Sequence, residues 1–335
     1  MRIWFNHWFS TAWHLIEMMK AVEPGRFTFI GSSTNRYALY GKVCDAFFEE
    51  PADLDGEGYA AFCLDFCREH GVDVFVPRRH QPAIVAHAAE FAALGVKLMA
   101  PRDAGLVREM DDKAAAYARL GEIVPARVPE HFVAGDLGAF ERAAAALQAR
   151  HGRVCYKLTR DEGARSFRVI DEGLTKPGAV YNKPGNKLSL STALSVMENY
   201  DFGIPVLVMP YLPDVEISVD CLRTSRGAMI IPRYKTNKRY SEVIFTPDVM
   251  DECRSIMDAL WLDAPANIQY KTANGERYLL EINTRMSGGL QLSCKASGLN
   301  LPAAALYELL GEPYPWAYPA FSSARVAHLE TPVCL

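Results

Sequence analysis

The sequence predicts a mixed α/β and α+β protein, in which a parallel-sheet domain precedes a larger region of paired strands and helices. Over the first 100 residues, short apolar runs alternate with helix-like segments, which is typical of a parallel sheet with helical crossovers. From about residue 150 onward, strand-like runs follow one another across short turns, which is typical of hairpins. The chain has 335 residues, half of them hydrophobic, and this is enough for a large core divided between two or three lobes.

The N-terminal domain is expected to contain four strands with helices between them. The expected strands are Arg2–Phe5, Phe27–Ile30, Val72–Pro77 and Lys97–Ala100, and the expected helices are Thr11–Val22, Gly58–His70 and Pro82–Leu94. The loop after the first strand has no G-x-G-x-x-G pattern, which argues against a dinucleotide site and an oxidoreductase. Side chains that follow strand ends, where open α/β sheets bind ligands, are His7, Arg78, Arg79 and His80. We expect this domain to supply a wall of a substrate site, although an ordinary surface role for each of the four stays open.

The remaining elements are predicted from apolar periodicity and from turn residues. The expected helices run from Lys113 to about Leu120 and over Asp136–Arg150, Ser189–Tyr200 and Pro247–Leu260. The expected strands cover residues 154–158, 166–170, 204–223 and 226–235, followed by a hairpin around Asn274-Gly275. An Asn-Gly pair between two apolar runs is a strong hairpin signal.

Composition narrows the class of protein. A net charge of −4 argues against broad nucleic-acid binding, which needs an excess of basic residues. The sequence contains no apolar stretch long enough to span a membrane and no signal-peptide pattern at its start. Its eight cysteines lack C-x-x-C spacing, so we expect free thiols and a reducing, cytoplasmic setting.

The hairpin carries the most informative chemistry. Glu281, Asn283 and Arg285 are spaced two apart on a strand, so they share one face. Folding the hairpin brings Gln269 near that face. A carboxylate with amide oxygens suits Mg²⁺ bound jointly with phosphates, and the arginine suits phosphate or carboxylate oxygens. The residues alone leave open that this is simply the solvated face of a sheet.

Two lysines and one bend add to this pattern. Lys113 follows two acids at a helix start, where an ordinary surface lysine is the simplest interpretation. Lys157 lies within an apolar strand, and a buried lysine needs an anionic partner. The segment Met209–Leu212 is a proline-bounded bend before Glu216. It could present backbone to an adenine and a carboxylate to a ribose, or be an edge strand with a tight turn.

In this order, the motifs resemble the ATP-grasp superfamily, and its short carbamoyl-phosphate-synthetase-like members in particular. The resemblance covers about residues 105 to 300 and is most specific in Gln269…Glu281-Ile-Asn283-Thr-Arg285. It implies a pre-ATP-grasp (Rossmann-like) domain over residues 1–105 and an ATP-grasp domain over 106–335. The latter would have a small nucleotide-covering lobe at about 130–205 and a C-terminal metal-binding lobe at about 206–330.

The resemblance also implies roles for individual residues. The ATP-binding residues would be Lys113, Lys157, Ser166, Met209, Tyr211, Leu212 and Glu216, and the ligands of Mg²⁺ (or Mn²⁺) would be Gln269, Glu281 and Asn283. Arg285 and Lys157 would be catalytic. The implied activity is that of a carboxylate–amine ligase, which forms an acyl phosphate from ATP, releases ADP and phosphate, and makes an amide from small-molecule substrates. The sequence does not determine the oligomeric state, and a homodimer through the N-terminal domain is consistent with it.

Two departures from the family pattern bear on this activity. The loop after Lys157 is poor in glycine and has Ser166 where a glycine is usual, and Met209-Pro210 replaces an acidic residue. The first favours the alternative that the protein is a nucleotide-binding module without ligase turnover. The sequence does not identify the acid or the amine.

Overall fold

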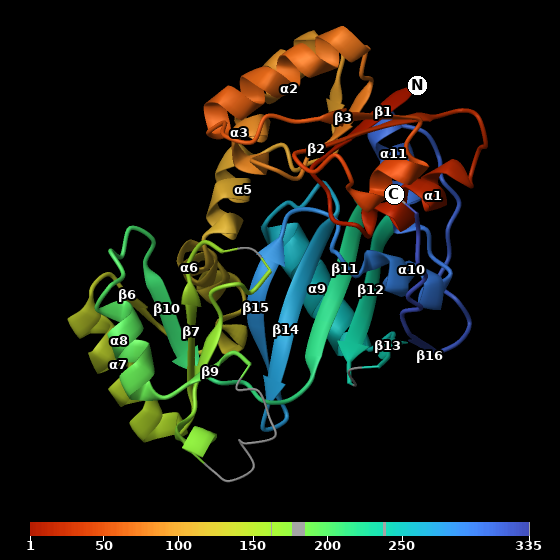
Figure 1. Cartoon of the computed structure of the whole chain (residues 1–335). Helices are drawn as coiled ribbons and strands as arrows, with labels where there is room; N and C mark the ends of the chain where they lie inside the picture. Colours follow the sequence, from red (N-terminus) through yellow and green to blue (C-terminus); the bar gives the residue numbers. More distant parts are fainter. Residues whose placement is uncertain (162, 176–184, 237–238, 335) are drawn as a thin grey trace. The chain divides into compact units, whose positions relative to one another are not determined.

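A computed structural model describes residues 1–161, 163–175, 185–236 and 239–334 (Figure 1). The chain divides into two compact units. Unit 1 contains Met1–Arg108, Val215–Gln269 and Ile282–Leu335, and unit 2 contains Glu109–Asp214 and Tyr270–Glu281. The chain therefore first leaves unit 1 three residues after the domain boundary predicted at residue 105. The assignment of the parts to a pre-ATP-grasp domain and two lobes stays a prediction.

Unit 1 begins with a five-stranded parallel sheet. Its strands are β1 (Arg2–Asn6), β2 (Thr28–Ser33), β3 (Ala46–Glu49), β4 (Val74–Val76) and β5 (Lys97–Leu98), in the order β3-β2-β1-β4-β5. All four pairings are parallel. The connecting helices are α1 (Ala12–Lys20), α2 (Gly56–His70), α3 (Gln81–Ala86) and α4 (Ala88–Ala93), with a short 3-10 helix at Leu39–Val43. The predicted parallel-sheet domain is confirmed.

Two details of this domain differ from the sequence prediction. Strand β3 was not predicted, and the single helix expected over Pro82–Leu94 is broken at His87 into α3 and α4. The His87 backbone leaves the helical region at φ −96° and ψ 18°. Its imidazole nitrogens lie 2.6 Å from Glu90 and 2.9 Å from Glu57, so side-chain bonding accompanies the break.

A second, six-stranded sheet has the order β15-β14-β11-β12-β13-β16. Its strands are β11 (Glu216–Thr224), β12 (Gly227–Lys235), β13 (Ser241–Ile244), β14 (Ala266–Ala273), β15 (Glu276–Asn283) and β16 (Ser323–Val326). At the turn between β14 and β15, Asn274 and Gly275 have φ of 53° and 82°. Positive φ at both central residues is typical of a type I′ turn, and the predicted hairpin is confirmed.

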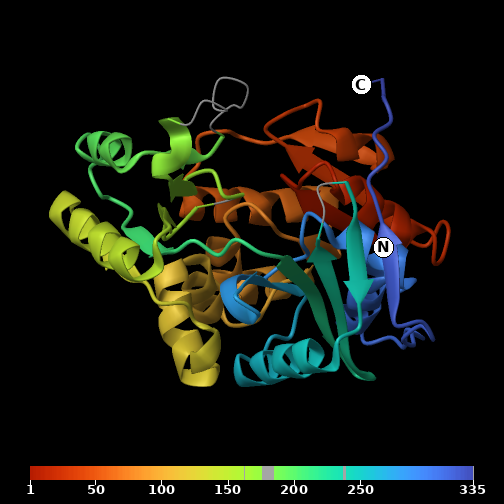
Figure 2. The same cartoon turned by 90° about the horizontal axis from the view of Figure 1, so that it is seen from below.

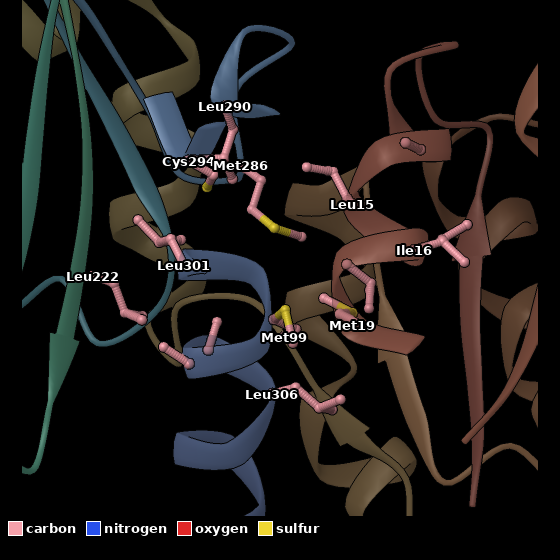
Figure 3. Close-up of a cluster of buried hydrophobic side chains, with 14 of the residues drawn as sticks. Leu15, Ile16, Met19, Met99, Leu222, Met286, Leu290, Cys294, Leu301 and Leu306 are labelled. Carbon is pink, nitrogen blue, oxygen red and sulfur yellow. The ribbon is translucent and has the colours of Figure 1, made fainter. Parts of the chain in front are cut away.

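The helices α10 (Leu290–Ser297) and α11 (Leu301–Leu310) join the two sheets of unit 1 into one core. Figure 3 shows Leu15, Ile16 and Met19 of α1 in the same cluster as Leu290 and Cys294 of α10 and Leu301 and Leu306 of α11. Helix α9 (Pro247–Ala259) packs against β11 and β12 (Figure 2). Burial of these apolar faces is the main stabilising contribution to the unit.

Unit 2 contains a smaller five-stranded sheet in the order β6-β10-β7-β8-β9. Its strands are β6 (Phe132–Ala134), β7 (Val154–Leu158), β8 (Arg168–Ile170), β9 (Lys187–Leu188) and β10 (Val206–Pro210). The helices α6 (Lys113–Ile123), α7 (Leu137–His151) and α8 (Leu190–Met197) belong to this unit, together with short 3-10 helices at Pro125–Arg127 and Glu172–Thr175. Helix α5 (Ala104–Asp111) precedes α6.

The strand predicted over residues 204–223 is in fact two strands. β10 ends at Pro210 and β11 begins at Glu216. The interruption follows from Pro210 and Pro213, whose nitrogens cannot donate to a ladder. Residues 173–187 form a stretch rich in glycine, proline and asparagine in the sequence, and residues 176–184 of it lie outside the described residues. Within the described part of the chain, no helix has both the length and the apolar character needed to cross a membrane.

Candidate active site

Lys113 opens helix α6 and is buried, with 7% of its surface exposed. Asp112 caps the helix by accepting a hydrogen bond from the Ala114 nitrogen at 2.9 Å. The Lys113 Nζ donates to the backbone oxygen of Asp161 at 3.0 Å. The simplest interpretation of this residue from the sequence, an exposed lysine at a helix start, is therefore wrong.

Lys157 is buried on β7, as predicted, and is 9% exposed. Its Nζ donates to the backbone oxygen of Leu280 at 3.2 Å and lies 6.0 Å from the centre of the Tyr117 ring. Burial lowers the pKa of Lys157 from its ordinary value to about 8, and the Glu281 carboxylate opposes this change. An ammonium group in such surroundings is stabilised by any further negative charge placed beside it.

Glu281 belongs to the same unit and interacts with both lysines. Its Oε2 lies 3.8 Å from the Lys113 Nζ, and its charge acts on Lys157. The Tyr117 hydroxyl lies 3.0 and 3.1 Å from the backbone oxygens of Leu279 and Leu280, which fixes this end of β15 against α6. Two buried cations and one partly exposed carboxylate therefore gather within unit 2.

The loop between β7 and β8 is closed by a hydrogen-bonded serine. The nitrogen and the hydroxyl of Ser166 both donate to Asp161 Oδ2 at 2.6 Å, and the Leu158 nitrogen donates to the Ser166 hydroxyl at 2.9 Å. Gly163 and Ala164 have positive φ, of 64° and 57°. Glu162 lies outside the described residues. Ser166 therefore replaces a glycine at a position where its hydroxyl shapes the loop.

The predicted adenine segment lines an apolar cluster in unit 2. Met209 and Leu212 are buried and Tyr211 is partly buried beside them, together with Tyr117, Cys155, Val169 and Leu207. β10 pairs with β7 as far as Pro210, whereas its pairing with β6 covers Val206–Val208. The segment thus offers an apolar surface and strand backbone at the end of a ladder, which are the features that a flat base would need.

The other predicted site residues belong to unit 1. Glu216, at the start of β11, forms an ion pair with Lys235. Gln269, on β14, donates its amide to Asn267 Oδ1 at 2.9 Å, so its carbonyl oxygen is the atom suited to a cation. The Arg285 guanidinium lies 4.9 Å from the centre of the Phe9 ring.

The predicted metal ligands divide between the units. Glu281 is in unit 2, and Gln269 and Asn283 are in unit 1. Glu281 and Asn283 lie two apart on β15, so strand geometry places them on one face. Among the described residues, no three His, Cys, Asp or Glu side chains gather as a metal site. The predicted set has one carboxylate and two amide oxygens, and such hard but weakly charged donors fit Mg²⁺ that shares its charge with phosphates.

Sequence reasoning missed a buried polar network in unit 1. Asp220 accepts hydrogen bonds from Asn267, Ser287 and Ser293 at 2.9, 2.7 and 2.6 Å. Ser293 in turn accepts a bond from Arg233 at 3.2 Å, and Arg233 is 3% exposed.

Gly289 makes room for this arginine. A Cβ atom at residue 289 would lie 2.2 Å from the Arg233 Nη2. One pattern in the sequence could have indicated this network: the polar residues Glu216, Ser218 and Asp220 are spaced two apart on β11 and therefore share one face of the strand.

Comparison with known proteins agrees with this architecture. The sequence model of a family described as "ATP-grasp in the biosynthetic pathway with Ter operon" matches residues 204–332. No curated protein matches the sequence.

Solved structures share the fold over nearly the whole chain. The biotin carboxylase domain of 2-oxoglutarate carboxylase from Hydrogenobacter thermophilus, solved with MgADP, ADP and bicarbonate, has a TM-score of 0.67 at 14% identity, over 94% of this chain and 71% of that one. Biotin carboxylase from Campylobacter jejuni has a TM-score of 0.65 at 16% identity, over 94% and 72%. N5-carboxyaminoimidazole synthetase from Staphylococcus aureus, solved with ADP, has a TM-score of 0.65 at 12% identity, over 94% and 78%.

The family match assigns residues 204–332 to an ATP-grasp family, and the solved structures show that nearly the whole chain shares the fold of biotin carboxylase and N5-carboxyaminoimidazole synthetase. The fold class predicted from the sequence is confirmed, and the family match agrees with the predicted superfamily over residues 204–332. The roles of the individual site residues stay predictions.

Proposed function

We propose that the protein is an ATP- and Mg²⁺-dependent ligase, which activates a carboxylate as an acyl phosphate for attack by an amine. The observation that carries the proposal is the gathering of Lys113, Lys157 and Glu281 in unit 2. Phosphoryl transfer depends on positioning and on charge neutralisation more than on a protein nucleophile. Two buried ammonium groups beside a carboxylate supply that kind of environment.

The lysines would hold the ATP phosphates. Lys157 is the stronger candidate, because its ammonium is buried beside Tyr117 and a backbone oxygen and gains most from an added anion. Lys113 would bind from the start of α6, whose helix dipole also favours negative charge. That similar folds are solved with ADP or MgADP supports this assignment.

The adenine would lie against the buried Met209 and Leu212 and beside Tyr211. Glu216 would accept hydrogen bonds from the ribose hydroxyls after exchanging its ion pair with Lys235. Ser166 would donate to a phosphate oxygen from the β7–β8 loop, which requires its hydroxyl to leave Asp161.

Mg²⁺, when bound, would neutralise phosphate charge, and Glu281, Asn283 and Gln269 are the residues that would hold it. Arg285 would orient the carboxylate substrate and stabilise the negative charge that develops on its oxygen. The carboxylate attacks the γ-phosphorus, the bond to ADP breaks, and the amine then displaces phosphate from the acyl carbon. The products are an amide, ADP and phosphate.

The decisive experiment replaces Glu281 with glutamine, which keeps the shape of the side chain and removes its charge. The protein is incubated with ATP, Mg²⁺ and pooled small acids and amines, and ADP release is measured. Mass spectrometry identifies any amide formed. We expect Glu281→Gln to lower turnover at least about 100-fold, because a charge-stabilising group is lost at the reacting phosphates. The matched control is Glu276→Gln on the same strand, since Glu276 is exposed and pairs with Arg127.

Two other results would change the conclusion. Nucleotide binding by calorimetry with no ADP release from any pool would favour a nucleotide-binding module, the alternative consistent with the glycine-poor loop. Equal turnover by Glu281→Gln and Glu276→Gln would refute the assigned metal and phosphate site. A homodimer remains a prediction, to be measured by sedimentation.

A further inference from the structure

An open pocket of about 860 Å³ lies at the carboxyl edge of the parallel sheet in unit 1. It is lined mainly by residues at or after the ends of β1, β2 and β4, three adjacent strands of the sheet, and also by Thr331 and Val333 near the C-terminus. The connections run outward from β1 through β2 to β3, and then resume on the other side with β4 and β5. The edge beside β1 and β4 is thus the point where the strand order reverses, and open α/β sheets bind ligands there.

Arg78 joins the two strands at this point. Its nitrogen donates to Asn6 Oδ1 at 2.7 Å, and its guanidinium donates to the backbone oxygen of His7 at 2.6 Å. Asn6 is fully buried and also donates to the Tyr59 hydroxyl at 3.0 Å. The guanidinium is therefore held at the pocket by a rigid, buried polar base, as a binding residue should be.

His7 also lines the pocket and has an unusual backbone conformation. Its φ is 45°, a region that non-glycine residues adopt at a cost of about 1–3 kcal/mol and that is frequent in ligand sites. The His7 Nδ1 lies 3.4 Å from the Thr34 nitrogen and 3.5 Å from the Ser33 hydroxyl. The hydroxyls of Ser10 and Thr11, at the start of α1, also line the pocket. Hydroxyl groups, an imidazole and a guanidinium together favour an anionic ligand.

Phe9 connects this pocket to Arg285, which is predicted to be catalytic. The Cζ atoms of Arg78 and Arg285 lie 4.0 and 4.9 Å from the centre of the Phe9 ring. The two guanidinium carbons can therefore be no further apart than the sum of those two distances. A Cβ at Gly288 would lie 3.7 Å from the same ring, so the chain after Arg285 also follows Phe9.

We propose that this pocket binds the acid substrate through a second anionic group, which Arg78 holds while Arg285 faces the carboxylate to be activated. The inference rests on the proposed ligase function and names its substrate class: a small acid with a further carboxylate or phosphate a few carbon atoms away. Arg78 is a specificity-determining residue in this scheme, since it contacts the part of the substrate that does not react.

Binding is measured on the full chain without ATP, by calorimetry with butyrate, succinate and 3-phosphoglycerate at millimolar concentrations. We expect one or both dianions to bind and butyrate to bind at least about tenfold more weakly, as a lost charged hydrogen bond predicts. Succinate and 3-phosphoglycerate distinguish a second carboxylate from a phosphate. Arg78→Met should weaken the preferred dianion at least about tenfold, and Arg78→Lys should restore part of the affinity.

The matched control is Arg102→Met, because Arg102 is 93% exposed and pairs with Asp263 at the surface of the same unit. Circular dichroism of each variant confirms that it is folded. Equal binding of butyrate and the dianions, no binding by either dianion, or unchanged affinity in Arg78→Met overturns the proposal. Dianion binding that depends on Arg78 without any ADP release would support the pocket as an anion-binding site and refute the ligase function.

Discussion

Lys157 should make the free protein less stable at neutral pH than a variant without its charge. The residue is buried on β7, its ammonium donates to one backbone oxygen, and burial lowers its pKa to about 8. We consider Lys157→Met, which keeps an unbranched chain of similar length. The variant is compared with the natural protein in the absence of nucleotide, so that no bound phosphate stabilises the ammonium.

The magnitude and its sign follow from the difference between the two pKa values. The unfolded lysine has its ordinary pKa of 10.5 and the folded one a pKa of about 8. Below pH 8 both states are protonated and the full cost of burying the charge is present. Between pH 8 and 10.5 the unfolded chain binds a proton that the folded chain does not, so the free energy of unfolding rises with pH. At about 1.4 kcal/mol per pKa unit, the total is about 3 kcal/mol.

The stability advantage of Lys157→Met should therefore shrink by about 2 to 3 kcal/mol between pH 7 and pH 10. Urea unfolding is followed by far-ultraviolet circular dichroism, because all five tryptophans lie in unit 1 and would not report on unit 2. Lys187→Met, which replaces an exposed lysine of the same unit paired with Asp171, should show no such trend. Parallel stability curves for the natural protein and Lys157→Met across this range would refute the reasoning.

Two further predictions concern unit 1. Gly289→Ala should displace the buried Arg233 guanidinium and destabilise the protein by about 1–3 kcal/mol, with a loss of any ligase turnover. The control is Gly288→Ala, whose Cβ would make only an ordinary contact with Phe9, so its free energy of unfolding should lie within about 0.5 kcal/mol of that of the natural protein. Equal unfolding midpoints for the two variants would contradict this prediction. Leu306→Ala should cost about 2–5 kcal/mol because it opens a cavity in a fully buried site. The exposed Val196→Ala is its control, and thermal unfolding measures both.

The sequence predicted those parts of the fold in which local chemistry decides the structure. The Asn274-Gly275 turn needs positive φ at both residues, and few other residue pairs adopt this conformation easily. These two residues were therefore enough to predict the hairpin. The alternation of strands and helices in the first 100 residues was equally direct. In the site, the prediction that Lys157 would be buried followed from its apolar neighbours on β7 and is confirmed.

Other features could not be predicted, for physical reasons. Helix α11 is buried along most of its length, so it lacks the apolar and polar faces from which a helix is normally recognised. Lys113 by itself looks like a surface lysine in the sequence, because the groups that bury it, Asp161 and Glu281, are far away along the chain. The bonds from Ser293 to Arg233 and Asp220 likewise join residues 60 and 73 positions apart and leave almost no local pattern.

The three separate segments of unit 1 affect how the protein can be made in a cell. Leu15 and Met19 lie near the start of the chain, and α10 and α11, which cover them, are synthesised last among its helices. At about 5–20 residues per second, the ribosome needs on the order of 15 to 60 s to add the intervening residues. During that interval the part of α1 that α10 and α11 cover faces water, where it promotes aggregation. We therefore expect a nascent chain that depends on chaperones until α11 has left the exit tunnel.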